Sequence, residues 1–424
     1  MDRGPRSVIT CDLDGRIETF NAGAQALFGY APEEVVGRKR VSLFSPGEVV
    51  LGHVGRWLAS AVRDGAYETD TVFVRRDGTR FAAHIRVTPT YRQGKQIGYC
   101  GVTVPLDRPV EEVAPPIDLG VRAFKWLVIT RAPFLSATVV AVLVGAAAVF
   151  RSTGTMDWGL LGLVLLGTSA LHAFGNTAND YFDWRSGADE ANADYVTPFT
   201  GGSRSIELGL IGPGALLRVS LAFLGLAAAC GAALALLQPS AIPGIAAVGT
   251  LGALSAFFYT APPLRLVAQK GVGEVVIGLT FGPLLTLGTG VVLRGEMWLP
   301  DAVVGIPVGL LTAGILWINE LPDIAGDVAA GKLNLVAVLG WRRARWGFVS
   351  LLAGAALAVV GLCASGAAPP WALGALAAAP LAWKAVRLLF ASRTPAALKP
   401  ACAATIQTQA AAGALLAAGL AVPF

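Results

Sequence analysis

The chain has 424 residues, of which 54% are hydrophobic and 14% charged, and its formal net charge is +5. This composition is too apolar and too poor in charge for an ordinary soluble protein of that length. The five cysteines include no CxxC pair, so the sequence suggests neither a disulfide framework nor a zinc site. Residues 1–118 hold fifteen basic and fifteen acidic side chains, so the whole net positive charge belongs to residues 119–424.

Residues 5–106 predict a small α+β domain with one sheet. The segment 7–20 indicates two short strands joined by an Asp-Leu-Asp-Gly turn, and Asn21 suits the N-cap of the short helices that follow. A longer helix is expected over roughly Glu48 to Arg63. Three strands should come next, and Asp77-Gly78 between the first two is a strong hairpin signal.

This order resembles a PAS sensory domain, most clearly in DGRIETFNAGAQALFGYAPEEVVGR and FVRRDGTRFAAHIRVTP. The resemblance implies a sensory module that can also mediate a homodimer, and it leaves the PAS ligand unknown. His53 on the long helix could ligate haem iron, although a lone helical histidine is more often packed or at the surface. Residues 107–120 combine proline with acidic residues and predict a semi-rigid linker.

Residues 121–424 predict an all-α polytopic membrane domain of about nine transmembrane helices, each close to the roughly 20 residues that cross a bilayer. We expect them near 126–150, 157–180, 212–236, 241–260, 272–293, 299–319, 345–365, 370–390 and 401–422. The small residues that are abundant in these segments suit close helix packing in lipid.

The positions of Lys and Arg between the predicted spans indicate the orientation. The connections on one side hold only Arg151 and Arg294. Those on the other side hold Arg185, Arg204, Arg265, Lys270, Lys332, Arg342, Arg343, Arg345, Arg393 and Lys399. By the positive-inside rule the richer side is cytoplasmic, and the first domain should share it.

Two acidic patches stand out, each directly behind a long apolar run. NTANDYFDWRSGAD follows the run 158–174, and NELPDIAGD follows the run 302–318. Spacings of three and four residues would place Asn176, Asn179, Asp180 and Asp183 on one helical face. Nine of the thirteen acidic residues in 119–424 lie in 180–207 and 320–327. Ionisable groups at membrane depth are costly and usually functional, although acids at the end of a span could simply be solvated.

Carboxylates without histidine or cysteine are the ligands that Mg²⁺ prefers. Mg²⁺ with few protein ligands keeps positions for substrate phosphates, so a diphosphate is the natural guest. Arg204, Arg265, Lys270 and Lys332 could add positive charge, and the apolar helix walls could hold a lipid tail. Such a site would stabilise a diphosphate leaving group as its bond to carbon breaks.

The motifs NDYFDWRSGAD and NELPDIAGD, with YTAPPLRLVAQKGVGE between them, resemble the UbiA superfamily of intramembrane prenyltransferases over 125–422. The resemblance implies Mg²⁺-dependent transfer of a prenyl group from an allylic diphosphate to an aromatic acceptor. Asp189 and the sequence GGSR at 201–204 are similar to the branch that prenylates 1,4-dihydroxy-2-naphthoate for menaquinone. One departure is GKLNL at 331–335, where close relatives usually read GKRTL.

The resemblance also implies roles for the aspartates, Asn179 and Arg131, and the other candidates come from the charge and spacing described above. The four catalytic aspartates are Asp180, Asp183, Asp323 and Asp327, and the metal ligands add Asn179 and Asp189. The substrate-binding residues are Asn176, Asn179, Arg131, Arg204, Tyr259, Lys270, Asn319 and Lys332. Arg131 stands where family members carry an arginine near the acceptor, and Tyr259 could either line the cavity or be an interfacial tyrosine.

Several alternatives stay open. The acceptor could be 4-hydroxybenzoate, a chlorin or a glycerophosphate lipid. The chain could instead be a non-catalytic membrane sensor that keeps the same fold, or a secondary transporter. Fusion to a PAS domain suggests regulation of the enzyme. The sequence contains no kinase, cyclase or DNA-binding segment, so we expect no nucleic-acid partner.

Overall fold

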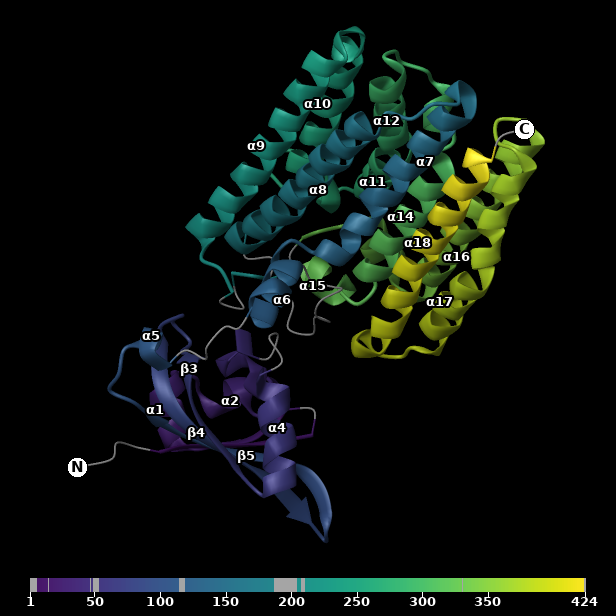
Figure 1. Ribbon diagram of the computed structural model, residues 1–424. Helices are drawn as coiled ribbons and strands as arrows, with labels where there is room; N and C mark the ends of the chain where they lie inside the picture. The colour runs from purple at the N-terminus through teal and green to yellow at the C-terminus, as the bar shows by residue number, and fades with distance from the viewer. Residues whose placement is uncertain are drawn as a thin grey trace. The chain divides into compact units, whose positions relative to one another are not determined.

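The structure is a computed structural model that describes residues 6–13, 15–45, 47–48, 53–113, 119–186, 204–206, 210–329 and 331–422. The chain divides into two compact units (Figure 1). They are Met1–Trp126 with Glu207–Leu210, and Leu127–Ile206 with Ile211–Phe424. Each unit has a hydrophobic core of its own.

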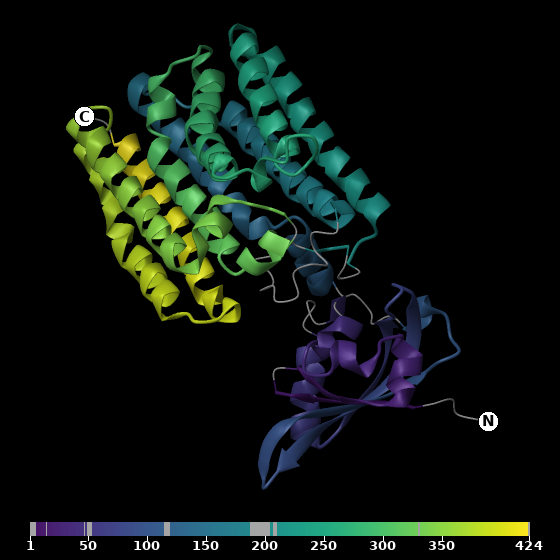
Figure 2. The same cartoon turned by 180° about the vertical axis from the view of Figure 1, so that it is seen from behind.

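The first unit is built on a five-stranded antiparallel sheet, which Figure 2 shows from behind. Its strands are β1 (Ser7–Asp12), β2 (Ile17–Phe20), β3 (Tyr67–Val74), β4 (Arg80–Arg92) and β5 (Lys95–Pro105). Their order in the sheet is β2-β1-β5-β4-β3. The first and last strands are therefore central neighbours, with Ser7 opposite Thr103. The small α+β domain expected from the sequence is confirmed.

Short helices surround the sheet and complete its core. They are α1 (Ala22–Phe28), α2 (Pro32–Val35), the 3-10 turn η1 (Val41–Phe44), α4 (His53–Asp64) and α5 (Val110–Val113). The Asn21 side chain caps α1 by accepting from the N–H of Ala24. Nδ1 of His53 lies 2.5 Å from a carboxylate oxygen of Glu48, so this ring nitrogen already has a protein partner. Helix α5 lies within the segment that the sequence predicts as a linker.

The second unit contains, among the described residues, nine helical segments long and apolar enough to cross a membrane. They are formed by η2 (Ala132–Phe134) with α7 (Leu135–Thr153), α8 (Trp158–Ser186), α9 (Pro213–Leu237), η3 (Pro239–Ala241) with α10 (Ile242–Phe258), α11 (Val272–Leu279) with η5 (Thr280–Leu284) and α12 (Leu285–Arg294), α13 (Pro300–Val303) with α14 (Ile306–Glu320), α16 (Leu335–Ala364), η6 (Pro370–Ala378) with α17 (Ala379–Ala391), and α18 (Lys399–Ala421). The shorter elements are α6 (Leu119–Ile129), η4 (Leu266–Ala268), α15 (Ile324–Ala329) and η7 (Pro395–Leu398). The prediction of a polytopic helical membrane domain is confirmed.

Three predicted spans have different limits in the structure. The second was expected to end near residue 180, but α8 continues to Ser186. The first was expected from residue 126, but α6 ends at Ile129 and the span begins at Ala132. The break lies at Arg131, whose φ of 52° is left-handed, and Pro133 follows two residues later. The seventh span begins at Leu335 instead of residue 345 because α16 continues on both sides of a kink at Gly340. Gly340 has a φ of 69°, which glycine adopts without steric cost.

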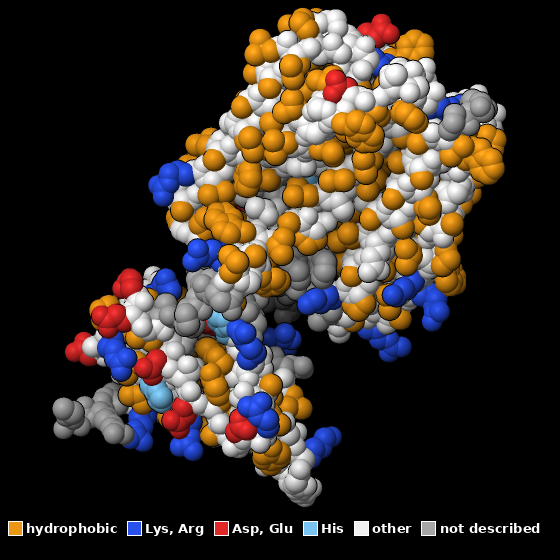
Figure 3. Space-filling model, viewed as in Figure 1, with side chains coloured by type: hydrophobic (Ala, Val, Ile, Leu, Met, Phe, Trp, Pro, Cys, Tyr) orange, Lys and Arg blue, Asp and Glu red, His pale blue; other side chains and the backbone are white. Residues whose placement is uncertain are grey.

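The flanks of the helical unit are largely hydrophobic, whereas Lys and Arg side chains gather along one end (Figure 3). At the opposite end Arg294 and Asp301 form a buried bidentate ion pair, with N–O distances of 2.8 and 3.0 Å. Arg294 also donates to Ser152 Oγ at 2.6 Å. The pair therefore ties α7, α12 and α13 together at the end of the bundle away from the acidic patches.

Candidate active site

The first acidic patch lies within the final turns of α8. Because α8 continues to Ser186, Asn176, Asn179, Asp180 and Asp183 are all helical and share one face, as their spacing predicts. Asp180 and Asp183 are both buried. These acids are therefore enclosed by protein, in contrast to the alternative of a solvated helix end.

Asp180 anchors the chain that returns to α8 at Arg204. The backbone N–H of Arg204 donates to Oδ1 of Asp180 at 2.8 Å, and that of Ser205 donates to Oδ2 at 2.9 Å. The Ser205 hydroxyl also donates to Oδ2. Arg131 Nη2 lies 3.8 Å from Oδ1. The Asp180 carboxylate therefore lies close to both the Arg131 guanidinium and the backbone N–H of Arg204.

Arg131 is held against α8 by polar contacts. Its Nη2 donates to Oδ1 of Asn179 at 2.8 Å. The Asn176 amide donates to the carbonyl oxygen of Thr130 at 3.0 Å. Two of the predicted substrate-binding residues therefore fix the segment that precedes α7 beside the first acidic patch.

An ion pair links the first acidic patch to Lys332, whose backbone N–H donates to the carbonyl oxygen of Asp327 in the second patch at 2.8 Å. Lys332 follows α15, and its Nζ donates to Oδ1 of Asp183 at 2.7 Å. Both side chains are nearly buried, with exposed fractions of 10% and 12%. Residues separated by almost 150 positions in the chain are therefore in direct contact, which the motifs alone could only suggest.

The second acidic patch runs from the end of α14 into α15. Oδ2 of Asp327 accepts from the Asn334 amide at 2.8 Å, while Oδ1 of Asn334 caps α16 by accepting from the N–H of Ala337 at 2.7 Å. Burial raises the pKa of Asp327 to about 7, the carboxylates of Asp323 and Asp183 add to the rise, and Lys332 opposes it. Asn334 was not predicted as a site residue. It lies in GKLNL, where close relatives usually read GKRTL.

Several buried polar atoms near these patches have no hydrogen-bond partner among the described residues. They are the Tyr259 hydroxyl, Oδ1 of Asn319, Oε2 of Glu320 and Oε2 of Glu274. The other oxygen of Glu274 accepts from the N–H of Leu335 at 2.7 Å. Buried polar groups are nearly always satisfied in folded proteins, so this set indicates a polar ligand. Burial, with Glu320 and Glu274 nearby, raises the pKa of Tyr259 well above its ordinary value, which keeps the phenol neutral.

A cavity of about 190 Å³ opens beside the first patch. Arg131, Asn176, Asn179 and Tyr259 line its polar part, and residues of α7, α8, α10, α11, η5 and α12 line the rest. A second, apolar cavity of about 460 Å³ lies between α8, α9, α10 and α12 and shares Thr168, Leu171, Val248, Gly249 and Leu285 with the first. The sequence left open whether Tyr259 lines the cavity or lies at the membrane interface. In the structure it lines the cavity.

The cavity also contains a polar residue that sequence reasoning did not select. His172 lines it and places Nδ1 2.8 Å from the Thr138 hydroxyl, and its ring packs on Phe281 with centroids 4.6 Å apart. The chain contains only two other histidines, His53 and His84, both in the first unit. The signal that could have revealed it is one imidazole in the apolar run 158–174.

The donor set fits Mg²⁺ in one particular mode. All candidate side chains present oxygen, as this hard cation requires. Among the described residues no group of three His, Cys, Asp or Glu side chains is close enough to hold a metal. Mg²⁺ that is held by one or two carboxylates keeps its other positions for water and substrate phosphates.

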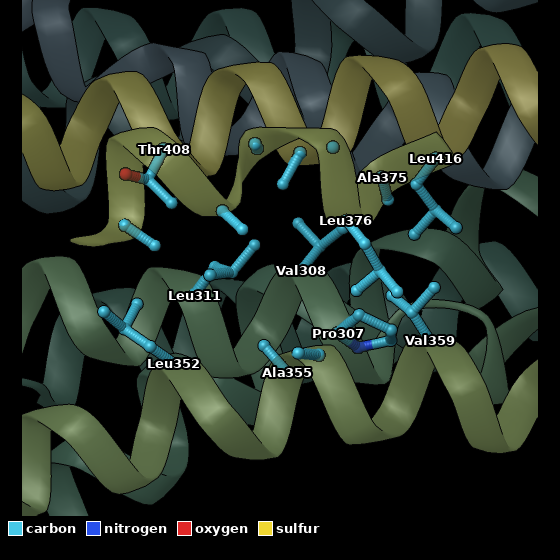
Figure 4. Close-up of a pocket in the computed structure, with 16 residues that line it drawn as sticks. Pro307, Val308, Leu311, Leu352, Ala355, Val359, Ala375, Leu376, Thr408 and Leu416 are labelled. Carbon is cyan, nitrogen blue, oxygen red and sulfur yellow. The ribbon is translucent and has the colours of Figure 1, made fainter. Parts of the chain in front are cut away.

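One predicted residue, Lys270, is not gathered at this site. Lys270 is exposed in the connection between α10 and α11. Among the described residues it makes no hydrogen bond or ion pair with the acidic patches. Asp189 lies outside the described residues, as do the first three residues of GGSR. A further cavity of about 100 Å³, between α14, α16, η6, α17 and α18, has an apolar lining except for Thr408 (Figure 4). The Thr408 hydroxyl donates to the Ala404 carbonyl at 2.7 Å, so this cavity offers no group for catalysis.

Comparison with known proteins places this arrangement in a family. Residues 138–406 match the UbiA prenyltransferase family, and residues 5–104 match the PAS domain. The first match covers more than half of the chain, which therefore belongs to the UbiA prenyltransferase family and carries an N-terminal PAS domain. Together with the nine apolar helical segments, this defines a multi-pass membrane protein.

Two curated relatives and one solved structure illustrate the similarity. Human UbiA prenyltransferase domain-containing protein 1 is 27% identical over 235 residues, which are 55% of this chain and 66% of that protein. The 1,4-dihydroxy-2-naphthoate octaprenyltransferase of Mycobacterium tuberculosis is 33% identical over 210 residues, 50% of this chain and 67% of that one. The apo structure of a UbiA homologue from Aeropyrum pernix K1 shares the fold, with 15% identity, a TM-score of 0.51 and coverage of 68% of this chain and 97% of that one. The alignment thus spans just under two thirds of the human relative.

Proposed function

We propose that this chain transfers a polyprenyl group from an allylic prenyl diphosphate to an aromatic acceptor in a Mg²⁺-dependent reaction, and that the acceptor is 1,4-dihydroxy-2-naphthoate in menaquinone biosynthesis. The observation that carries the reaction class is the contact between Lys332 and Asp183, which unites two acidic patches beside an elongated cavity. The name of the Mycobacterium tuberculosis relative supports the acceptor.

Each part of the site has a role in this proposal. Asp180, Asp183, Asp323 and Asp327, with Asn179, would hold Mg²⁺ together with the diphosphate, and the bound metal would neutralise charge on the leaving group. The Arg131 guanidinium lies beside Asn179 and Asp180, and the Lys332 ammonium lies beside Asp183. The apolar cavity between α8, α9, α10 and α12 offers space for the prenyl tail.

The side chains favour ionisation of the allylic diphosphate. The C–O bond breaks, its electron pair leaves with the diphosphate, and Lys332 and Arg131 stabilise the departing charge. The neutral Tyr259 ring lines the cavity where the allylic cation would form, and the electron-rich face of an aromatic ring attracts cations. An aromatic carbon of the acceptor then bonds to the allyl carbon. For the naphthoate, loss of carbon dioxide from that carbon restores aromaticity.

The test is prenyl transfer in purified membranes with a radiolabelled prenyl diphosphate and a panel of aromatic acceptors, with and without Mg²⁺. Transfer to 1,4-dihydroxy-2-naphthoate that requires Mg²⁺ is expected. Asp180→Asn and Asp323→Asn should each abolish it while the protein remains folded in detergent. Full activity of both variants would contradict the metal assignment, and transfer only to 4-hydroxybenzoate or another acceptor would contradict the naphthoate.

We further propose that the acidic patches and the PAS domain face the cytoplasm, and that the PAS domain regulates transfer and mediates a homodimer. The excess of Lys and Arg on one side of the predicted spans supports the orientation. Labelling of single introduced cysteines in intact cells tests it. An impermeant maleimide should reach a cysteine placed at Gly366 and should not reach one placed at Lys270.

A further inference from the structure

The last part of the chain carries charge of only one sign. After Asp327 the sequence contains eight Lys and Arg residues and no Asp or Glu. Six of these cations are exposed and have no ion-pair partner among the described residues: Arg342, Arg343, Lys384, Arg387, Arg393 and Lys399. Positive charge therefore accumulates toward one end of α16, α17 and α18, where these six cations form no ion pair with the residues that the structure describes.

Contacts between aromatic and basic residues bring the ends of α16 and α17 together. The rings of Trp346 and Phe390 meet at 5.3 Å between centroids. The Arg345 guanidinium lies over Trp341 at 5.2 Å and donates to the carbonyl oxygen of Ser392 at 3.0 Å. The two helices thus present a joined surface, and Arg345 is occupied in joining them.

The exposed cations lie on the same helix faces as exposed aromatic rings. Arg342 is one turn before Trp346 on α16, and Trp383, Arg387 and Phe390 recur at helical spacing on α17. Trp346 and Trp383 are each 63% exposed. Such amphipathic aromatic side chains occupy the headgroup level of a bilayer.

Two of the cations lie deeper than an orientation signal requires. Arg387 and Lys384 precede the end of α17 by four and seven residues, which places them about 6 and 10 Å inside the span. A charge at that depth is costly unless its long side chain reaches the membrane interface. The phosphate of a lipid is the anion present there.

We propose that the α16–α17 face, defined by Arg342, Arg343, Trp346, Lys384, Arg387 and Phe390, binds the headgroup of an anionic phospholipid. The basic side chains bind its phosphate, and the aromatic rings pack beside its glycerol and upper acyl carbons. This binding does not depend on the proposed transfer reaction, because none of these residues lines the cavities beside the acidic patches.

The experiment is native mass spectrometry of the full chain in detergent, titrated with phosphatidylglycerol or phosphatidylcholine. Phosphatidylglycerol should bind in preference. Each Lys or Arg near an anionic surface contributes about fivefold, so Arg342→Gln/Arg343→Gln/Arg387→Gln should weaken binding about a hundredfold. Replacement of the same three residues by lysine should preserve it. Arg218→Gln is the matched control, because Arg218 is a lone exposed cation on α9.

Three outcomes would overturn the proposal: equal binding of the two lipids, unchanged binding by the glutamine variant, or complete displacement of the lipid by millimolar inorganic phosphate. The last would identify a site for a free anion. Helical circular dichroism of each variant verifies the fold, and the lysine variant keeps the test informative if the glutamine variant unfolds.

Discussion

Lys332 is the residue through which the two halves of the candidate site are coupled. Lys332→Met removes its ammonium from Asp183 and leaves a buried carboxylate without that partner. We expect transfer to fall by at least about a hundredfold, the magnitude seen when a group that stabilises transition-state charge is removed. Lys332→Arg, assayed under the same conditions, should retain more activity because it keeps the positive charge. Equal loss in both variants would indicate a packing role.

If Asp327 binds a divalent cation as proposed, the binding of that cation should depend on pH. Its pKa of about 7 leaves it largely protonated at pH 6, and a metal ion must displace that proton. The apparent affinity for Mg²⁺ should therefore rise by up to about tenfold per pH unit below pH 7 and level off above it. Calorimetric titration in buffers of different ionisation enthalpy measures the released proton. An affinity that is flat between pH 6 and pH 8 would exclude Asp327 as a ligand.

His172 offers the cavity an imidazole edge that is held in place by Thr138 and Phe281. His172→Leu removes hydrogen bonding at similar bulk, so we expect a higher KM for the aromatic acceptor and an unchanged KM for the prenyl diphosphate. Steady-state kinetics with each substrate varied in turn separates these effects. Thr138→Val, which frees the ring without removing it, should have a smaller effect. A rise in both KM values would show that the variant disturbs the whole cavity.

The site residues that were predicted differ from those that were missed in the pattern that they form in the sequence. The aspartates were predictable because carboxylates directly behind apolar runs are rare in membrane segments. Asn334 contacts Asp327 and caps α16 at Ala337, and Glu274 accepts from the N–H of Leu335. None of these contacts has a repeating pattern in the sequence. Such contacts depend on which helix ends meet in the folded chain.

At the scale of elements, the bundle is held firmly at the end away from the acidic patches. Arg294→Met would leave the Asp301 carboxylate buried without its partner, and such losses cost about 3–5 kcal/mol. Thermal unfolding in detergent should show a clear loss for this variant. Arg294→Met/Asp301→Leu should recover much of it, because both charges are then gone. A single variant as stable as the parent protein would mean that water reaches Asp301.

The limits of the helices were less predictable than their number. Apolar composition predicts nine spans, and the structure has nine candidate spans among its described residues. The break at Arg131 was missed because the first span was expected to run through it from residue 126. The kink at Gly340 was missed because the seventh span was expected to begin only at residue 345, after Arg342 and Arg343. Glycine occurs 51 times in the chain, so a single glycine in a span carries little information about its backbone conformation.

At the scale of the whole molecule, a PAS domain accompanies the membrane unit in one chain. If the PAS domain regulates transfer, removal of residues 1–118 should change the transfer rate under at least one redox or ligand condition. The assay compares the full chain with the truncated chain in membranes, with expression matched by immunoblot. Identical rates under every condition would contradict regulation. Size-exclusion chromatography with light scattering on both forms tests whether the domain also mediates a homodimer.

The apolar cavity of Figure 4 has a mechanical consequence. A space of about 100 Å³ that is lined by aliphatic side chains leaves volume unfilled between α14, α16, η6, α17 and α18. Hydrostatic pressure favours states that eliminate such volume. This part of the bundle should therefore yield under pressure, and pressurised xenon, which enters apolar cavities of this kind, should bind there and stiffen it.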